Sequence, residues 1–205
     1  LDVDGDTSIT ADTDDQIDFK TGGTDRLKVQ STSGNNVVVS DGLTLSDGNI
    51  TFSGSGHGIH LGVTSATAAN LLDDYEEGTF TPTLTGASAN PSSIAYNAQT
   101  GNYTKVGNVV HIDLILYPSS HSGGSGALRI AGLPFAAAQR ATGAVQFDRI
   151  RIQADKPTTV VAAIEGTVSY VNLVEMFDAS DENAGNVEID DLAGNVFILT
   201  SFSYK

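Results

Sequence analysis

The stretch YTKVGNVVHIDLILY, residues 103–117, gives the clearest indication of the fold class of this sequence. The dipeptide Gly107-Asn108 suits a tight turn that needs φ > 0, and it separates two runs of β-forming residues, so the stretch predicts a β-hairpin. After the turn, side chains two residues apart share one face of a strand. One face is predicted to carry Val110, Ile112, Leu114 and Leu116. The opposite face is predicted to carry Val109, His111, Asp113 and Ile115.

The remainder of residues 79–205 has the same character. Short runs of alternating or β-branched residues are separated by clusters of turn-forming residues, which is typical of an antiparallel β-sandwich or a jelly-roll-like domain. Helical patterns are nearly absent there. Besides the hairpin, strands are predicted at 79–85, 128–130, 143–152, 158–165, 167–177, 186–190 and 196–204.

Residues 1–62 show a different pattern. Large apolar residues occur in pairs two positions apart, which places both members of a pair on one face of a short strand. Turn-forming runs such as Ser40-Asp41-Gly42 separate the pairs. The pairs are Ile17/Phe19, Leu27/Val29, Val37/Val39, Leu43/Leu45, Ile50/Phe52 and Ile59/Leu61.

This segment has an apolar stripe but too little apolar material to enclose a core within one chain. Leaving the stripe in water forfeits about 1.5–3 kcal/mol for each large side chain. Either the segment is disordered, or several copies wrap around a common axis and bury their stripes together, and the persistent repeat favours the second alternative. A three-fold arrangement would also pair strand edges between chains. The twelve residues of the six pairs are therefore predicted to form the core around a trimer axis.

A short helical segment is predicted between the two parts. The stretch ATAANLLDDYEE, residues 66–77, is the only one with helical character, and Thr64 or Ser65 is a candidate cap. Gly78 is predicted to end it, and a strand is predicted to begin at Thr79. The resulting division is a repetitive β shaft at 1–62, a neck at 63–78 and a β-sandwich head at 79–205.

Composition and charge exclude several function classes. The 205 residues include 25 acidic and 10 basic side chains, a net charge of −15, which argues against contacts with nucleic-acid phosphates. No run of about 18 apolar residues occurs, so no membrane insertion is expected. Cysteine is absent, which excludes disulfides and thiolate sites. Without a basic and apolar leader after Leu1, we expect no signal peptide, and we expect the chain to be a fragment or a processed product.

Four stretches resemble parts of bacteriophage tail and head fibre proteins, marine ones especially. The run NLLDDYEEGTFTP at 70–82 resembles their neck-to-head junction. The runs GNYTKVGNVV at 101–110 and IAGLPF at 130–135 resemble a first hairpin and a later element of their heads. The run DDQIDFKTGGTDRL at 14–27 resembles their shaft repeats. The resemblance is clear to about Phe135 and weak beyond it.

The resemblance implies an architecture and indicates a fibre-like virion protein, without specifying a receptor. The architecture is an all-β parallel homotrimer with an N-terminal fibrous shaft, a short helical or irregular neck and a C-terminal antiparallel β-sandwich head. Our leading hypothesis for the role is non-catalytic adhesion of a virion to its host, with other virion proteins and a cell-surface glycan or protein as partners. Two alternatives remain open: a capsid decoration or connector fibre without a receptor, and a carbohydrate-binding module.

Receptor contact is predicted in the loops of the head, where binding residues usually lie. The longest predicted loop is 117–124, in which Tyr117 and His121 are the candidate residues because aromatic rings stack on the apolar faces of sugars. The next longest is 178–186. An ordinary mobile loop is the alternative at both places.

A metal site is considered at His57. In a strand His57 shares the parity of Ile59 and Leu61, so three symmetry copies could offer three imidazoles at the axis. His60 would point to the opposite side, and a Gly-rich turn with ordinary histidines is the alternative. The run Asp2-Val3-Asp4-Gly5-Asp6 has the carboxylate spacing of calcium loops but lacks their Gly and Glu further on, which favours a solvated turn. No cofactor is therefore expected.

No catalytic constellation occurs in the sequence. The run GGSGA at 123–127 is a near miss to a nucleophile elbow and is interpreted as a loop. Phosphate-binding Gly-Lys motifs are absent as well. The chain is therefore expected not to be an enzyme.

Overall fold

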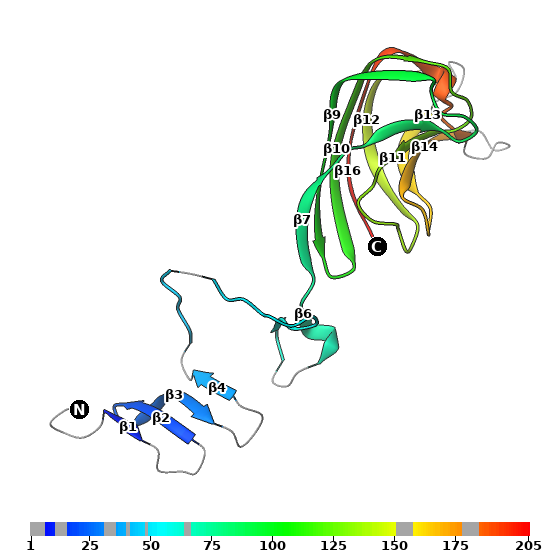
Figure 1. The fold of residues 1–205 in the computed structure, drawn as a ribbon. Helices are drawn as coiled ribbons and strands as arrows, with labels where there is room; N and C mark the ends of the chain where they lie inside the picture. The colour runs from blue at the N-terminus through cyan, green and yellow to red at the C-terminus, as the bar shows by residue number, and fades with distance from the viewer. Residues whose placement is uncertain are drawn as a thin grey trace. The chain divides into compact units, whose positions relative to one another are not determined.

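The computed structural model of the chain describes residues 7–10, 16–30, 36–39, 42–47, 49–63, 67–150, 158–177 and 185–205. The regular secondary structure of these residues is β, apart from two single-turn 3₁₀ helices (Figure 1). Their contacts group the chain into two compact units, Leu1–Thr51 and Phe52–Lys205, here called the N-terminal and C-terminal units. The division into shaft, neck and head stays a prediction.

The N-terminal unit contains a four-stranded antiparallel meander. Its strands pair in sequence order, and the hairpin between the second and third turns at Gly22-Gly23, both of which have positive φ as such two-residue turns require. The strands are β1 (Ser8–Thr10), β2 (Gln16–Thr21), β3 (Thr24–Gln30) and β4 (Asn36–Val39).

Two predicted strands of this segment are not formed in the single chain. Residues 42–45 and 49–52 have no regular structure, although Leu43/Leu45 and Ile50/Phe52 have the expected spacing. Alternating apolar residues do not hold a strand by themselves, because its N–H and C=O groups need the edge of a neighbouring strand. Within the described residues no such edge lies beside these two pairs.

The predicted helix at 66–77 is also wrong in most of its length. Helical geometry is limited to η1 (Ala68–Asn70), which is followed by β6 (Leu71–Leu72) paired with β5 (Ile59–His60). From Tyr75 the chain enters β7 (Tyr75–Phe80), so Gly78 lies inside a strand and does not end a helix. An isolated helix of about 12 residues is marginal in water, and pairing with a long neighbouring strand overrides it.

Cross-strand contacts explain why the acidic run at 73–77 joins the sheet. Strand β7 pairs with β9 (Ser93–Val106) from Tyr75 opposite Val106 onward. The Tyr103 hydroxyl donates to Glu76, and the Lys105 ammonium pairs with Asp74. Sheet pairing thus supplies partners for carboxylates that would repel one another along a short helix.

The C-terminal unit is dominated by one curled antiparallel sheet (Figure 1). Within the described residues this sheet has ten strands, in the order β7-β9-β10-β16-β12-β13-β14-β11-β8, with β15 beside β14. Besides β7 and β9, the strands are β8 (Thr83–Gly86), β10 (Val109–Ser122), β11 (Leu128–Ala131), β12 (Ala141–Ile150), β13 (Thr158–Ile164), β14 (Tyr170–Phe177), β15 (Gly185–Asn186) and β16 (Leu192–Tyr204). Of the strand predicted at 186–190, only Asn186 lies in a strand, and the helix η2 (Ile189–Asp191) takes up its last two residues.

The expected antiparallel β class is confirmed, and the two layers expected of a sandwich are halves of this one sheet. Strand β12 connects them, because Ala141–Ala144 pair with β13 whereas Val145 onward pairs with β16. Both halves contribute to a single buried core, which includes Leu114 of β10, Ile198 of β16 and Leu173 of β14. A strand that changes neighbours is the usual way in which a sheet turns such a corner.

The two edges of the curled sheet are consecutive in the sequence. Strand β7 lies at one edge and β8 at the other, and only two residues join them. Side chains of β9 bridge this change of layer: the Leu84 N–H donates to the Tyr96 hydroxyl (2.9 Å), and Gln99 Nε2 donates to the Pro82 carbonyl (2.9 Å). These bonds satisfy backbone groups at the place where strand pairing stops.

The predicted hairpin is confirmed in both turn and parity. Strands β9 and β10 turn at Gly107-Asn108, and Gly107 has a φ of 57°. On β10, Val110, Ile112, Leu114 and Leu116 have 3%, 0%, 1% and 0% of their surface exposed. The opposite set faces away from the core, with Val109, His111 and Asp113 exposed and Ile115 half-buried.

Packing around Gly86 gives a test of this fold. A Cβ atom added at Gly86 would lie 2.5 Å from the Ser125 carbonyl oxygen and also collide with that of Ala89. Because backbone must move to relieve this overlap, Gly86→Ala is expected to destabilise the protein by about 1–3 kcal/mol, a fall in Tm of several degrees. Thermal unfolding followed by circular dichroism measures the change.

The matched control is Gly166→Ala, where the nearest atom, the Ala138 carbonyl oxygen, would lie at an ordinary 3.4 Å. Its Tm is expected to stay level or to rise slightly. Equal Tm values for the two variants would show that the strand end at Gly86 is packed differently.

Candidate functional site

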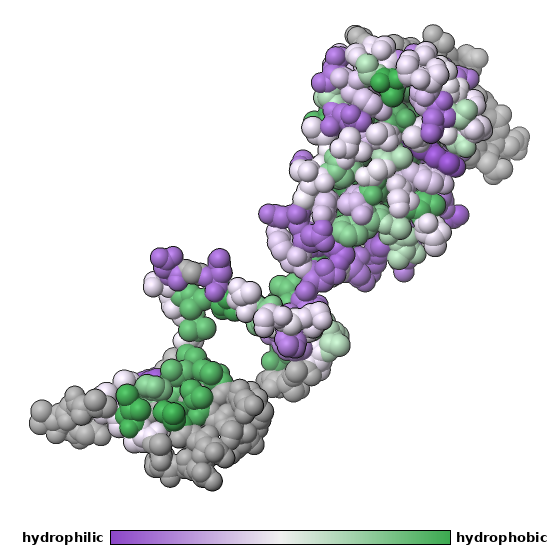
Figure 2. Space-filling model, viewed as in Figure 1, coloured by the Kyte–Doolittle hydropathy of each residue, from purple (hydrophilic) through white to green (hydrophobic). Residues whose placement is uncertain are grey.

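The N-terminal sheet presents an apolar face that no described residue of its own unit covers. Strand register places Ile9, Phe19, Leu27 and Val39 in one row across the four strands. A second row two residues away on the same face contains Ile17, Val29 and Val37. These seven residues are called the apolar face. All except the half-buried Leu27 are exposed, Val37 by 63% and Ile9 by 59%, and Figure 2 shows hydrophobic side chains gathered on this unit.

The opposite side of the same strands is polar. Lys20 Nζ lies 3.6 Å from an Asp25 carboxylate oxygen, and Arg26 Nε is within hydrogen-bond distance of the Thr21 hydroxyl. A register shift between Phe19 and Lys20 preserves the separation of apolar and polar side chains through the hairpin. Two-residue periodicity therefore places all apolar residues of this sheet but Val38 on one side.

The six remaining residues predicted for the trimer axis are exposed too. They are Leu43, Leu45, Ile50, Phe52, Ile59 and Leu61, with exposed fractions of 46–65%. Ile59 lies in β5, and the other five are in segments without regular structure. Contact with a three-fold axis stays a prediction for all twelve residues.

The predicted receptor loop at 117–124 is not a loop for most of its length. Residues 117–122 continue β10, paired with β9 down to Ser122 opposite Ser93. Pro118 lacks an N–H, but it lies between two register shifts of the ladder, where a missing donor is tolerated. Tyr117 and His121 are therefore strand residues.

Tyr117 and His121 are both half-buried. The Tyr117 ring makes an edge-to-face contact with Phe197 of β16, with the ring centroids 6.2 Å apart. His121 Nδ1 is buried and has no hydrogen-bond partner among the described residues. No contact between these two side chains is described. Their role in receptor binding stays a prediction. Of the second predicted loop, residues 178–184 lie outside the described residues.

The structure places His57 in a turn. Its N–H donates to the Gly54 carbonyl (3.3 Å), and its ring lies so close over Gly54 that a Cβ there would be 2.6 Å from Nδ1. Among the described residues no group of three His, Asp or Glu side chains could hold a metal ion. The axial metal role of His57 needs other copies of the chain and stays a prediction, and the calcium-like run at Asp2–Asp6 lies outside the described residues.

One grouping of serine, histidine and aspartate occurs on the outer face of β10 and β16. His111 Nδ1 is 3.0 Å from the Ser203 hydroxyl, and His111 Nε2 is 3.3 Å from the Ser201 hydroxyl. An Asp113 carboxylate oxygen lies 3.6 Å from the same Nε2. The imidazole and the carboxylate are about half exposed, so they lack the water-excluded setting that activates a serine nucleophile. The grouping fits a hydrogen-bonded strand surface.

A buried carboxyl group lies inside the C-terminal unit. Glu175 of β14 shares the inward parity of Val171 and Leu173 and is only 4% exposed. Burial raises the pKa of Glu175 above its ordinary value, and the charge of Asp191 raises that pKa further. A raised carboxyl pKa is found in general acids, but a side chain so enclosed does not reach a polymer outside the sheet. Its charge is instead a cost to the folded state.

No described helix is long and apolar enough to cross a bilayer.

Comparisons with known proteins gave few matches. No protein-family model matches the chain, and no curated protein matches it. Among solved structures, the chain is similar to part of the crystal structure of the Dettilon tailspike protein, with 18% sequence identity and a TM-score of 0.45. The match covers 63% of this chain and 23% of the tailspike chain.

The raised pKa of Glu175 gives a pH-dependent prediction. The folded state binds the Glu175 proton more tightly than the unfolded state. The protonated carboxyl therefore contributes its full stability at pH values below its ordinary pKa of 4.5, and this stability is lost as pH rises through the folded-state pKa. Glu175→Gln keeps the shape of the protonated side chain. It is expected to raise Tm by a few degrees at pH 7, with the gain shrinking towards pH 4.5.

The control is Glu165→Gln, which removes the ion pair of a partly exposed carboxylate with the exposed Arg140 and should change Tm little. A Glu175→Gln protein that is less stable than the wild type at pH 7 would mean that the buried carboxylate is paired.

Proposed function

We propose that this chain is a subunit of a trimeric bacteriophage fibre that attaches the virion to its host surface. The observation that carries the proposal is the apolar face of the N-terminal sheet. Monomeric proteins seldom expose contiguous large apolar patches without a partner. The stretches quoted above that resemble fibre proteins indicate the class of assembly.

The partner that fits this face is another copy of the same chain. The apolar face is made of β-branched and aliphatic side chains with one aromatic ring, and the reverse side of the sheet is polar. Identical stripes bury one another when three copies surround a common axis, and each large side chain then contributes about 1.5–3 kcal/mol. Further along the chain, Leu43, Leu45, Ile50, Phe52, Ile59 and Leu61 are exposed as well.

Strand edges support the same arrangement. In the described meander β1 and β4 each have one neighbour, so each has an unpaired edge that attracts other strands. Closed three-fold association pairs such edges within the trimer and so prevents open-ended aggregation. The irregular segments at 42–45 and 49–52 gain the strand neighbour they lack in one chain.

Adhesion is assigned to the C-terminal unit. That unit has its own core, so its outer surface is free to contact other molecules without loss of folding energy. Weak contacts repeated on three copies, and on several fibres of one virion, add up through effective concentration. On this proposal binding alone is the function, with no chemical step.

A pair of substitutions on β4 tests the assembly. Val37 belongs to the apolar face, whereas its neighbour Val38 points to the opposite side, and both are exposed in one chain. Val37→Asp is expected to abolish the trimer, because three unpaired charges would be buried at one level. Val38→Asp is expected to leave it intact. Light scattering distinguishes one chain of 21.2 kDa from a species three times heavier.

A wild-type chain that is monomeric would overturn the assembly, and a trimeric Val37→Asp protein would show that this face lies outside the interface.

The salt dependence of cell binding tests the adhesion. A trimer carries three times the −15 charge of one chain, and host envelopes are also anionic. Screening of this repulsion is expected to raise the binding of fluorescently labelled protein to host cells as NaCl or CaCl₂ increases from very low concentration. A steady loss of binding with added salt would indicate long-range attraction between opposite net charges instead.

A further inference from the structure

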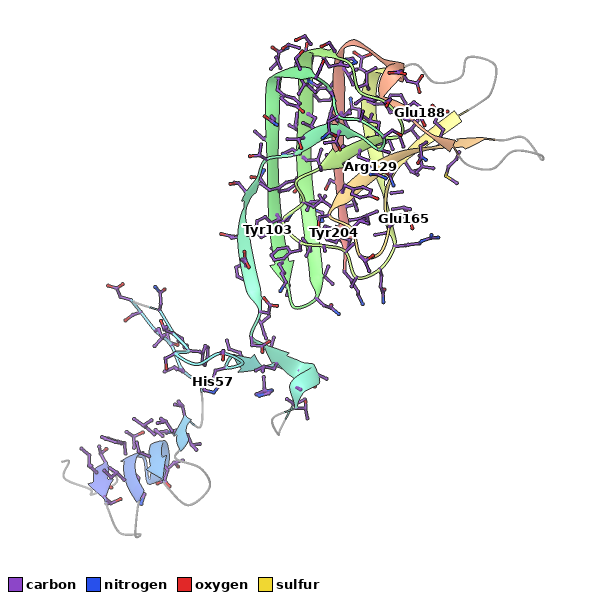
Figure 3. The ribbon with its side chains drawn as sticks, turned by 45° about the vertical axis from the view of Figure 1, so that its right-hand side comes forward. His57, Tyr103, Arg129, Glu165, Glu188 and Tyr204 are labelled. Atoms are coloured by element: carbon purple, nitrogen blue, oxygen red, sulfur yellow. The ribbon has the colours of Figure 1, made fainter. Side chains whose placement is uncertain are left out.

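An arginine on the outer face of the C-terminal sheet is stacked on a tyrosine. Arg129 of β11 lies opposite Asn172 of β14, and the next outward residue, Ala131, lies opposite Tyr170. The guanidinium carbon of Arg129 is 4.2 Å from the Tyr170 ring centroid. The small side chain of Ala131 leaves room for this diagonal contact, which fixes the plane of the guanidinium on the ring. Figure 3 labels Arg129.

Arg129 has no carboxylate partner in the part of the chain that the structure describes. Lys105 and Arg140 of the same unit are paired with Asp74 and Glu165, respectively. Arg129 Nε is buried and has no hydrogen-bond acceptor among the described residues, and no described residue accepts a hydrogen bond from its two Nη groups. In a chain with 25 acidic and 10 basic residues, a half-buried arginine that makes no ion pair with the described residues is unexpected.

Small polar side chains lie beside Arg129 on the same face. Thr85 of β8 is directly opposite Arg129 on one side, and Asn172 is directly opposite on the other. The Thr85 hydroxyl is 3.5 Å from the Arg129 carbonyl oxygen, and it makes no other hydrogen bond with the described residues. All three side chains are half-buried. A fixed cationic fork between a hydroxyl and an amide is an arrangement that suits a hydroxylated anion.

We propose that Arg129, with Tyr170, Asn172 and Thr85, binds the carboxylate of an acidic sugar. This inference rests on the proposed adhesion and names the class of ligand. The two outward Nη groups donate to both carboxylate oxygens, Asn172 and Thr85 hydrogen-bond the ring hydroxyls, and Tyr170 holds the fork in place. No proton or bond is transferred.

The arrangement favours a sugar over a peptide carboxylate. Donors and acceptors stand on both sides of the cation along one row of the sheet, which matches the several hydroxyls that a uronic acid carries beside its carboxylate. A phosphorylated sugar offers the same hydroxyls with a tetrahedral anion. The planar fork matches a planar carboxylate, and the experiment includes the phosphate as a separate arm.

The test uses the full chain with three probes: an oligogalacturonate, its carboxyl-reduced neutral counterpart, and a phosphorylated mannose oligosaccharide. Calorimetry measures the affinity, and ¹⁵N NMR follows the Arg129 Nε–H signal. Binding of the oligogalacturonate alone, with a shift of that signal, is expected. Arg129→Gln should lower the affinity about tenfold or more, and Arg129→Lys should lower it as well, because a lysine keeps the charge but lacks the fork.

Arg140→Gln is the matched control, since Arg140 is 82% exposed and already paired with Glu165, and it should leave binding unchanged. Thermal unfolding of each variant shows that it is folded. Equal losses for the two glutamine variants, equal binding of the neutral probe, preference for the phosphorylated probe, or no binding of any probe would each overturn the assignment.

Light scattering on the same samples separates this inference from the proposed function. A trimer that does not bind the oligogalacturonate would overturn the sugar site and leave the proposed fibre assembly intact. A monomer that binds it through Arg129 overturns the fibre and keeps the site.

Discussion

Strand side chains alternate between two faces, and each apolar face needs something to cover it. In the C-terminal unit the chain meets this need itself, because the curled sheet turns the inner faces of β10 and β16 towards those of β13 and β14. In the N-terminal unit the same alternation gives one layer, and no described residue forms a second layer over it. Its apolar face therefore needs a partner from outside the unit to cover it. The exposed apolar pairs that follow it in the sequence need such a partner as well.

The curl of the sheet also determines where a binding surface can lie. Leu128 and Ile130 face inward and are completely buried. Arg129, the residue between them, therefore points outward. There it meets Tyr170 only because β11 and β14 are neighbours in the sheet. The contact has no counterpart in local sequence, since 41 positions separate the two residues.

The alternation of apolar and polar residues along the sequence predicted the features that depend on a strand's own two faces. The hairpin at Gly107-Asn108, the inward set on β10 and most strand positions in 79–205 could be derived from the sequence, because a period of two specifies a face whatever the neighbour is. The apolar pairs up to Val39 were likewise placed on one face. Register between strands, which brings Arg129 to Tyr170, could not be derived, and that site was missed.

Errors arose where pairing overruled local preference. The helix expected at 66–77 gave way to β7 because β9 extends far enough to pair with it from Tyr75. The loop expected at 117–124 became strand because two register shifts accommodate Pro118, which moved Tyr117 and His121 out of a loop. The strands expected at Leu43/Leu45 and Ile50/Phe52 are not formed. Here the cause is the lack of pairing, since no neighbouring strand edge is described beside them.

On the proposed assembly, the two functional surfaces of the chain need each other. A single guanidinium–carboxylate contact on an open sheet is exchanged readily with water and salt, and the charge of the chain repels anionic cells, so one copy of the Arg129 site would hold a surface glycan only briefly. Three copies fixed on one axis convert the second and third contacts into intramolecular ones, which lengthens attachment without any stronger contact. The apolar face would then act in adhesion without touching the host, because it sets the number of weak sites that act together.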